Sequence, residues 1–250
     1  MTTSAIYASE GKSASNRKQT ARIAGLLYLI VVITGIVSLA YVPSHINMQG
    51  DASTTVSNIV ASDLLFRIGI LADLICFTVF LLLPLVLYRL LSSVNKNTAV
   101  LMVMFAVISA PISLLSVRNK LDIVSLVSAS DYSRAMAPAL MHDQVTLALD
   151  RYRNGLLVAS IFWGLWLLPF GYLVFKSGFL PRILGILLMI GCFGYLINVF
   201  GSVMSSGYSK TALADFATLP ASLGEIGTCL WLLIIGTREP KQVRAQAERA

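Results

Sequence analysis

The sequence predicts an all-α fold: a polytopic transmembrane helical bundle of six spans, with both termini in the cytoplasm and an extramembrane helix between the third and fourth spans. Of the 250 residues, 56% are hydrophobic and only 12% are charged, whereas soluble domains average about 25% charged residues. The apolar residues form runs of about 20, the length that crosses ~30 Å of hydrocarbon. Basic residues stand at the ends of these runs, as expected for a chain whose solvent is the membrane.

Six apolar runs define the expected spans. The first run exceeds the usual apolar region of a signal peptide and lacks a convincing cleavage site, so it is counted as a span. The segment before it is polar and rich in Ser and Lys, which predicts disorder. The expected spans are residues 21–42, 64–91, 98–117, 154–175, 180–203 and 218–236, within a membrane domain of residues 21–236 flanked by a cytoplasmic tail, 1–20, and a C-terminal tail, 237–250.

The orientation follows from the Lys and Arg residues near the span ends, because cytoplasmic loops carry an excess of them. The cytoplasmic group would contain Lys12, Arg17, Lys18, Arg22, Arg89, Lys96, Lys176, Arg182, Arg238, Lys241, Arg244 and Arg249. The outer group would contain Arg67, Arg118, Lys120, Arg134, Arg151, Arg153 and Lys210. The imbalance between the two groups predicts that both termini lie inside.

The long connection after the third span carries a helical pattern. Pro138 suits a first helical turn, and the residues Ala137, Met141, Val145, Ala148 and Tyr152 recur at helical spacing. We expect a helix outside the membrane here. The pattern leaves open whether that helix continues into the fourth span or lies on the outer surface.

Two hexapeptides suggest an internal repeat. Residues 22–27, RIAGLL, open the first span and residues 182–187, RILGIL, open the fifth. The spans that follow them contain the tetrapeptides around Asp73 and Glu225. A repeat would make the two hairpins copies in one orientation, with these carboxylates in equivalent positions.

Asp73 and Glu225 are ionisable residues inside expected spans, where a charge costs about 2.5–3.5 kcal/mol and by default marks a functional site or a buried pair. Each lies roughly 10 Å below the outer boundary at 1.5 Å per residue. The outer halves of the spans also carry Arg153 and further polar residues. The candidate ligand-binding cluster is Arg67, Asp73, Arg118, Asn119, Asn154, Tyr195, Asn198 and Glu225.

Three interpretations of this cluster remain open: charge pairs that fix helix register, a ligand or ion site in an outward-facing cavity, and protonated carboxylic acids. Arg67 stands six residues before Asp73 and therefore on another helix face. Arg118 is the first expected partner of Asp73, because it ends a neighbouring span on the outer side.

Several chemistries have no residues to support them. His45 and His142 both fall in expected loops, so neither a haem nor a His-rich metal centre is predicted. The cysteines Cys76, Cys192 and Cys229 fall inside spans without a CxxC pair. We predict no cofactor and no metal, and assign no catalytic residue. Nucleic acid is not an expected partner, because the basic residues form no patch interleaved with aromatic ones.

The chain resembles a known family through residues 161–165, IFWGL, then 171–173, GYL, and the turn 176–185, KSGFLPRILG, together with 22–25, RIAG, and Arg118-Asn119. It is similar to a bacterial multi-span membrane family, domain of unknown function four-three-eight-six, over residues 22–236. The resemblance implies six spans and a bacterial cytoplasmic membrane. It implies no activity, cofactor or site residue.

The expected role is therefore the binding or transport of a small or lipid-like ligand in an outward-facing polar cavity. A membrane enzyme acting on a lipid, with Asp73 or Glu225 as acid or base, is an alternative. A structural or regulatory subunit whose charges only pair with one another is another. Membrane lipids are the expected surroundings, and the oligomeric state is left open.

Overall fold

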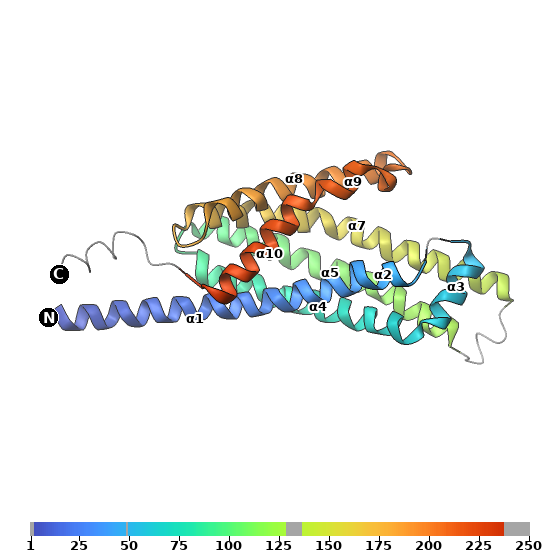
Figure 1. Cartoon of the computed structure of the whole chain (residues 1–250), viewed down its shortest axis with the longest axis horizontal. Coiled ribbons are helices and arrows are strands. Elements are labelled where there is room, and N and C mark those ends of the chain that lie inside the picture. Colours follow the sequence, from blue (N-terminus) through green and yellow to red (C-terminus); the bar gives the residue numbers. More distant parts are fainter. Residues whose placement is uncertain (1–2, 49, 129–136, 238–250) are drawn as a thin grey trace. The chain divides into compact units, whose positions relative to one another are not determined.

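The structure is a computed structural model that describes residues 3–48, 50–128 and 137–237, with side chains from residue 15 onward. All regular secondary structure in these ranges is helical (Figure 1). The prediction of an all-α bundle is confirmed, because six helical segments are long and apolar enough to cross a membrane. These segments are Ser15–His45, Asp63–Leu91, Lys96–Val127, Pro138–Lys176, Arg182–Met204 and Ala212–Ile234.

Apart from the segment between residues 127 and 138, the helical elements follow one another with short connections, as expected for antiparallel neighbours in a bundle. In chain order they are α1 (Thr3–Ile36), η1 (Val37–Tyr41), α2 (Val42–His45), α3 (Ala52–Ala61), α4 (Asp63–Leu91), α5 (Lys96–Val127), α7 (Pro138–Lys176), α8 (Arg182–Met204), η2 (Tyr208–Lys210), α9 (Ala212–Ala217) and α10 (Leu219–Ile234). Most of the expected C-terminal tail, from residue 238 onward, lies outside the described residues.

The helices exceed the apolar runs that predict them. Helix α1 reaches back to Thr3, through a segment whose composition predicts disorder. No proline stands between residue 1 and Val42 to end the helix. Helix α5 continues past the expected end at Val117 to Val127. The expected span ends therefore mark changes of polarity, whereas the helical backbone continues beyond them.

The expected helix after the third span is present and runs directly into the fourth span. Helix α7 begins at Pro138 and continues without a break to Lys176. Its 39 residues correspond to about 58 Å at 1.5 Å per residue, which is well over the ~30 Å of a hydrocarbon core. Helix α7 is therefore longer than a single crossing of the membrane requires.

The first span ends irregularly. Its last turns form the π-helical segment η1, after which Pro43 occupies the first turn of α2. Helix α3 then begins at the cap residue Asp51, whose carboxylate accepts hydrogen bonds from the Ser53 hydroxyl and the Thr54 backbone N–H. These hydrogen bonds hold the pKa of Asp51 below its ordinary range.

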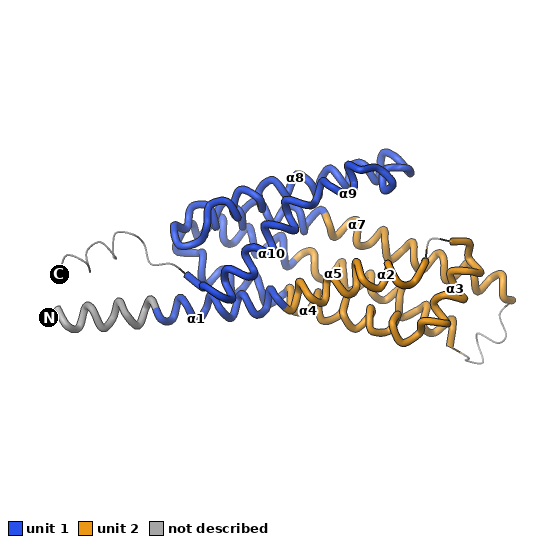
Figure 2. The backbone as a smooth tube through the Cα atoms, viewed as in Figure 1, with its two compact units in different colours: residues 1–29, 81–107, 161–250 blue, residues 30–80, 108–160 orange. Residues whose placement is uncertain are grey.

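The chain divides into two compact units, and α1, α4, α5 and α7 contribute residues to both (Figure 2). Unit 1 comprises Met1–Leu29, Leu81–Val107 and Ile161–Ala250; unit 2 comprises Ile30–Phe80 and Ile108–Ser160.

In unit 1 the helices approach closely at small residues. A Cβ atom on Gly191 would lie 2.6 Å from the Cα atom of Ala221, so α8 and α10 pack backbone against backbone. In unit 2 the core is built from α3, α4, α5 and α7, with Ile59, Phe66, Ile123 and Val145 almost fully buried.

Candidate functional site

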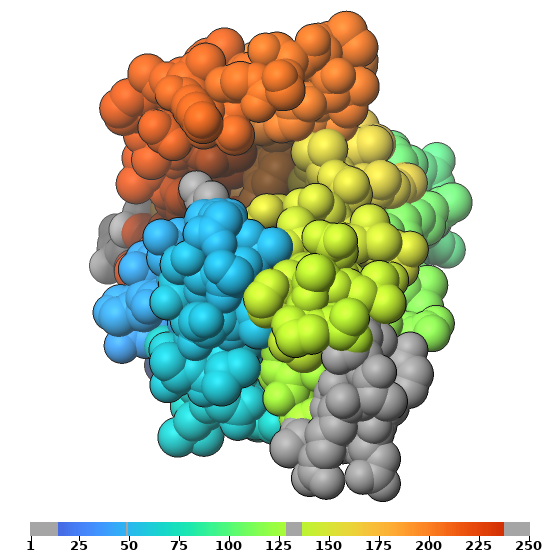
Figure 3. Space-filling view, turned by 90° about the vertical axis from the view of Figure 1, so that its right-hand side faces the viewer, coloured from blue at the N-terminus to red at the C-terminus, as the bar shows by residue number. Residues whose placement is uncertain are grey.

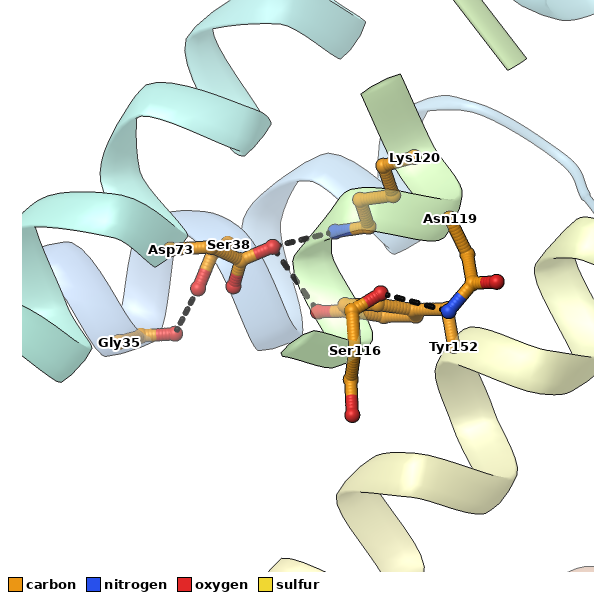
Figure 4. A network of polar contacts seen from close by, with 7 residues as sticks. All are labelled: Gly35, Ser38, Asp73, Ser116, Asn119, Lys120 and Tyr152. Atoms are coloured by element: carbon orange, nitrogen blue, oxygen red, sulfur yellow. Dashed lines mark hydrogen bonds and ion pairs between the residues drawn. The ribbon is translucent and has the colours of Figure 1, made fainter. Parts of the chain in front are cut away.

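The most deeply buried charges in the described residues form a polar cluster in unit 2. Asp73 on α4 has no exposed surface. The Lys120 ammonium on α5 donates a hydrogen bond to Asp73 Oδ2 over 2.7 Å, and the Tyr152 hydroxyl on α7 donates to the same oxygen over 3.0 Å. Figure 4 shows the three side chains pointing toward one another from three helices. We call these residues the Asp73 cluster.

The Asp73 cluster compensates its charges internally. The side chains of Lys120 and Asp73 are 5% and 0% exposed, and a charge so far from water persists only when it is paired and hydrogen-bonded. The Lys120 Nζ atom also lies 4.0 Å from the centre of the Tyr152 ring, within the range of a cation–π interaction. The second carboxylate oxygen, Asp73 Oδ1, is buried without a hydrogen-bond partner among the described residues.

Small residues allow α5 and α7 to approach closely beside the Asp73 cluster. A Cβ atom on Gly155 would collide with the Ser116 side chain, so glycine permits the close approach of the two helices. Tyr152 belongs to the predicted stripe of α7, whose members Val145 and Ala148 are likewise buried. The stripe thus turns Tyr152 toward α4 and α5.

A cavity of about 200 Å³ adjoins the Asp73 cluster within unit 2. The irregular turn η1 supplies two of its wall residues, and π-helical turns occur often at functional sites. Apolar and polar side chains share the wall. The lining residues are Ser38, Leu39, Pro43, Met48, Lys120, Leu149, Tyr152 and Arg153.

Arg153 joins the two sides of this cavity. Its guanidinium donates to the Met48 carbonyl over 2.8 Å and approaches the Asp150 carboxylate at 3.4 Å. Figure 3 shows the segment that contains α3, in blue, beside the first turns of α7, in yellow-green. The hydrogen bond from Arg153 therefore ties the loop before α3 to α7 at this end of unit 2.

Glu225 has separate surroundings in unit 1. The Tyr28 hydroxyl donates to Glu225 Oε1 over 3.0 Å. Tyr28 is almost fully buried against the rings of Trp166 and Phe170, with centroid distances of 6.3 and 6.4 Å. Glu225 itself is half-buried. Asp73 and Glu225 thus belong to different units and bond to different partners.

The prediction that Arg118 pairs with Asp73 was wrong. Arg118 is exposed, and Lys120, two residues later, forms the ion pair instead. Two residues along an α-helix differ by about 200° around the axis, so they cannot face the same neighbour. Arg67 pairs with Asp63 over 2.8 Å on the exposed surface of α4, in agreement with its expected place on another face from Asp73.

The remaining candidates are dispersed. In unit 2, the Asn119 amide donates to the Ser116 carbonyl over 3.0 Å and Asn154 is exposed. In unit 1, Asn198 accepts a hydrogen bond from the Tyr208 hydroxyl over 2.7 Å, while half-buried Tyr195 packs against Gly164. Asn119, Asn198 and Tyr195 thus have local contacts of their own.

The sequence contained one signal for Lys120 that the search for isolated charges missed. Ser109, Ser113, Ser116 and Lys120 recur at intervals of four, three and four residues, and all four are buried. Such spacing is typical of one helix face. This polar stripe therefore indicated which side of α5 faces the interior, and Lys120 is its last member.

The six apolar helices define a multi-pass α-helical membrane protein. Within that class, the chain belongs to the family described as domain of unknown function (DUF4386), whose model matches residues 23–236. The resemblance predicted from the sequence is thereby confirmed. An uncharacterized protein of Archaeoglobus fulgidus is 28% identical over 153 residues, which cover 61% of this chain and 74% of that protein. No solved structure matches the chain.

Proposed function

We propose that this protein binds a small amphipathic or lipid-like ligand in the cavity of unit 2, beside the Asp73 cluster. One observation carries the proposal: Lys120 takes part in a buried ion pair and also lines the cavity. An ionisable residue inside a membrane span marks a functional site by default, and ligand cavities combine apolar walls with a few polar groups.

A purely structural pair explains less of this arrangement. Such a pair needs only to be sealed from lipid on all sides, whereas Lys120 and Tyr152 both contribute to the cavity wall. An enzyme that uses a cavity carboxylate as acid or base also fits less well. The lining residues of the cavity, all from the described ranges, include no aspartate or glutamate.

The proposal includes an orientation and a location. With the N-terminus in the cytoplasm of a bacterial cell, α1 would enter the membrane from inside and reach the cavity residues Leu39 and Pro43 near the outer surface. Exposed Ser57 in α3 would then lie outside, and exposed Ser93 after α4 would lie inside. In intact cells, an impermeant maleimide should label Ser57→Cys and spare Ser93→Cys. The reverse pattern would overturn the orientation.

Ligand binding itself can be tested by blocking the cavity. Leu39 lines it yet is 43% exposed, so Leu39→Trp can extend across the opening without forcing a buried core apart. Ile33, in the preceding helix α1, is 53% exposed and does not line the cavity, which makes Ile33→Trp the matched control.

The measurement is native mass spectrometry of protein released gently from lipid. Wild type and Ile33→Trp should retain a small bound molecule that Leu39→Trp loses. Equal retention by Leu39→Trp and the control, or no retained molecule in any of the three proteins, would contradict the proposal.

A further inference from the structure

We infer that the ligand of the unit 2 cavity carries a singly charged oxyanion, such as a carboxylate or a phosphodiester, on a short apolar body. The inference rests on the proposed function and specifies the chemistry of its ligand. It begins with charge: the two ionisable cationic residues in the cavity wall are Lys120 and Arg153, and no carboxylate from the described residues lines it.

Lys120 lines the cavity and retains hydrogen-bond donor capacity. An ammonium group has three N–H donors, and one of them bonds to Asp73 Oδ2. Because Asp73 already balances the charge of Lys120, this residue offers an anion hydrogen bonds and little net charge.

Arg153, whose own side chain is 48% exposed, supplies a positive charge that its neighbours balance only weakly. The neighbouring Asp150 is 54% exposed in its side chain and lies 3.4 Å away, so solvent weakens that ion pair. The remaining bond of Arg153 goes to the neutral Met48 carbonyl. This weakly paired positive charge beside the cavity favours one negative charge on the ligand, held by charge-assisted hydrogen bonds.

The other wall residues define the body of the ligand. Leu39, Pro43, Met48 and Leu149 provide apolar surface. A cavity of about 150 Å³ accommodates benzene, so the volume of about 200 Å³ here suits a group on the order of ten non-hydrogen atoms. A medium-chain carboxylate has this size and charge, and so does the head region of an anionic phospholipid.

Two probes separate charge from apolar contact. Octanoate and its neutral analogue octanol are titrated into the full-length protein in a non-ionic detergent, and binding is measured by calorimetry. Octanoate should bind at least tenfold more tightly than octanol. Arg153→Gln should weaken octanoate binding about tenfold or more, since a hydrogen bond to a charged group is worth that much, and Arg153→Lys should restore most of it.

The control is Arg151→Gln, because Arg151 is exposed on the same helix and does not line the cavity. This variant should bind octanoate as the wild type does. Native mass spectrometry from nanodiscs of phosphatidylglycerol or phosphatidylcholine then identifies the source of the oxyanion. Preferential retention of phosphatidylglycerol assigns it to a membrane lipid, and octanoate binding without that preference assigns it to a water-borne molecule.

The experiment distinguishes a failure of the charge assignment from a failure of the proposed function. If octanol binds as tightly as octanoate and Arg153→Gln changes neither, the cavity binds ligands but the charge assignment is overturned. If neither probe binds and neither lipid is retained, the proposed function falls together with the inference.

Discussion

The ion pair between Asp73 and Lys120 makes a quantitative prediction about stability. Asp73→Asn removes the negative charge while keeping the side-chain shape, and leaves the Lys120 ammonium, 5% exposed, without its counter-charge. Removing one partner of a buried pair costs about 3–5 kcal/mol. For a chain of this length, at about 2–4 °C per kcal/mol, Tm should fall by roughly 6–20 °C.

The double variant Asp73→Asn/Lys120→Met separates an orphaned charge from a lost attraction. It leaves no uncompensated charge in the interior, so it should recover at least half of the loss caused by Asp73→Asn alone. All variants are compared by intrinsic fluorescence during thermal unfolding in one detergent.

Asp63→Asn is the matched control on the same helix. Asp63 also forms an ion pair at 2.8 Å, with Arg67, but their side chains are 44% and 45% exposed. An exposed pair contributes about 1 kcal/mol or less, so Tm should change little. Equal losses from Asp73→Asn and Asp63→Asn, or a double variant no more stable than Asp73→Asn, would refute the reasoning.

Three further predictions concern other parts of the molecule. Tyr152→Phe removes a hydrogen bond to the buried carboxylate and should cost about 1.5–3 kcal/mol in the same unfolding assay, whereas Tyr172→Phe, at a site 39% exposed, should change stability little. Gly25→Ala would bring a Cβ atom to 2.5 Å from the backbone of α10 and should cost about 1–3 kcal/mol, while Gly35→Ala meets its nearest atom at an ordinary 3.6 Å and should be tolerated. Because the pKa of Asp51 is lowered, its stabilising cap on α3 is fully present above the ordinary value of 3.8 and is lost as pH falls through the lower, folded-state pKa. Hydrogen exchange in α3 should therefore stay slow at pH 4 and accelerate only in stronger acid. Asp51→Asn should abolish this pH dependence.

The six spans were predictable because apolar runs of membrane length leave few alternatives. The end of α5 was not. Arg118 and Lys120 suggested that a connection begins after Val117, yet α5 continues to Val127. A hydropathy pattern treats every charge as solvated, whereas the charge of Lys120 is neutralised by Asp73 from another helix. Hydropathy alone does not reveal this long-range pairing, although the polar stripe of Ser109, Ser113, Ser116 and Lys120 indicates the face of α5 that carries it.

The sequence predicted how far along each span the polar residues of the candidate site lie, but not which neighbouring helix their side chains face. The position of Asp73 within an apolar run correctly indicated a buried carboxylate. Its partners depend on the rotation of α5 and α7 about their axes, which places Lys120 inward and Arg118 outward. Because Asp73 and Glu225 were expected at a similar depth in the membrane, the sequence also suggested one cluster around both. Glu225 instead bonds to Tyr28 in unit 1. Depth along a helix does not determine which helix lies beside it.

The central claim is that unit 2 holds a ligand beside the Asp73 cluster. An experimentally determined structure of the protein purified with its native lipids tests it most directly. We predict density that belongs to no protein atom in the cavity next to Lys120 and Tyr152, with the Lys120 ammonium still bonded to Asp73. A cavity closed by its own lining side chains, with Lys120 sealed between Asp73 and Tyr152 and no room for another molecule, would contradict the claim.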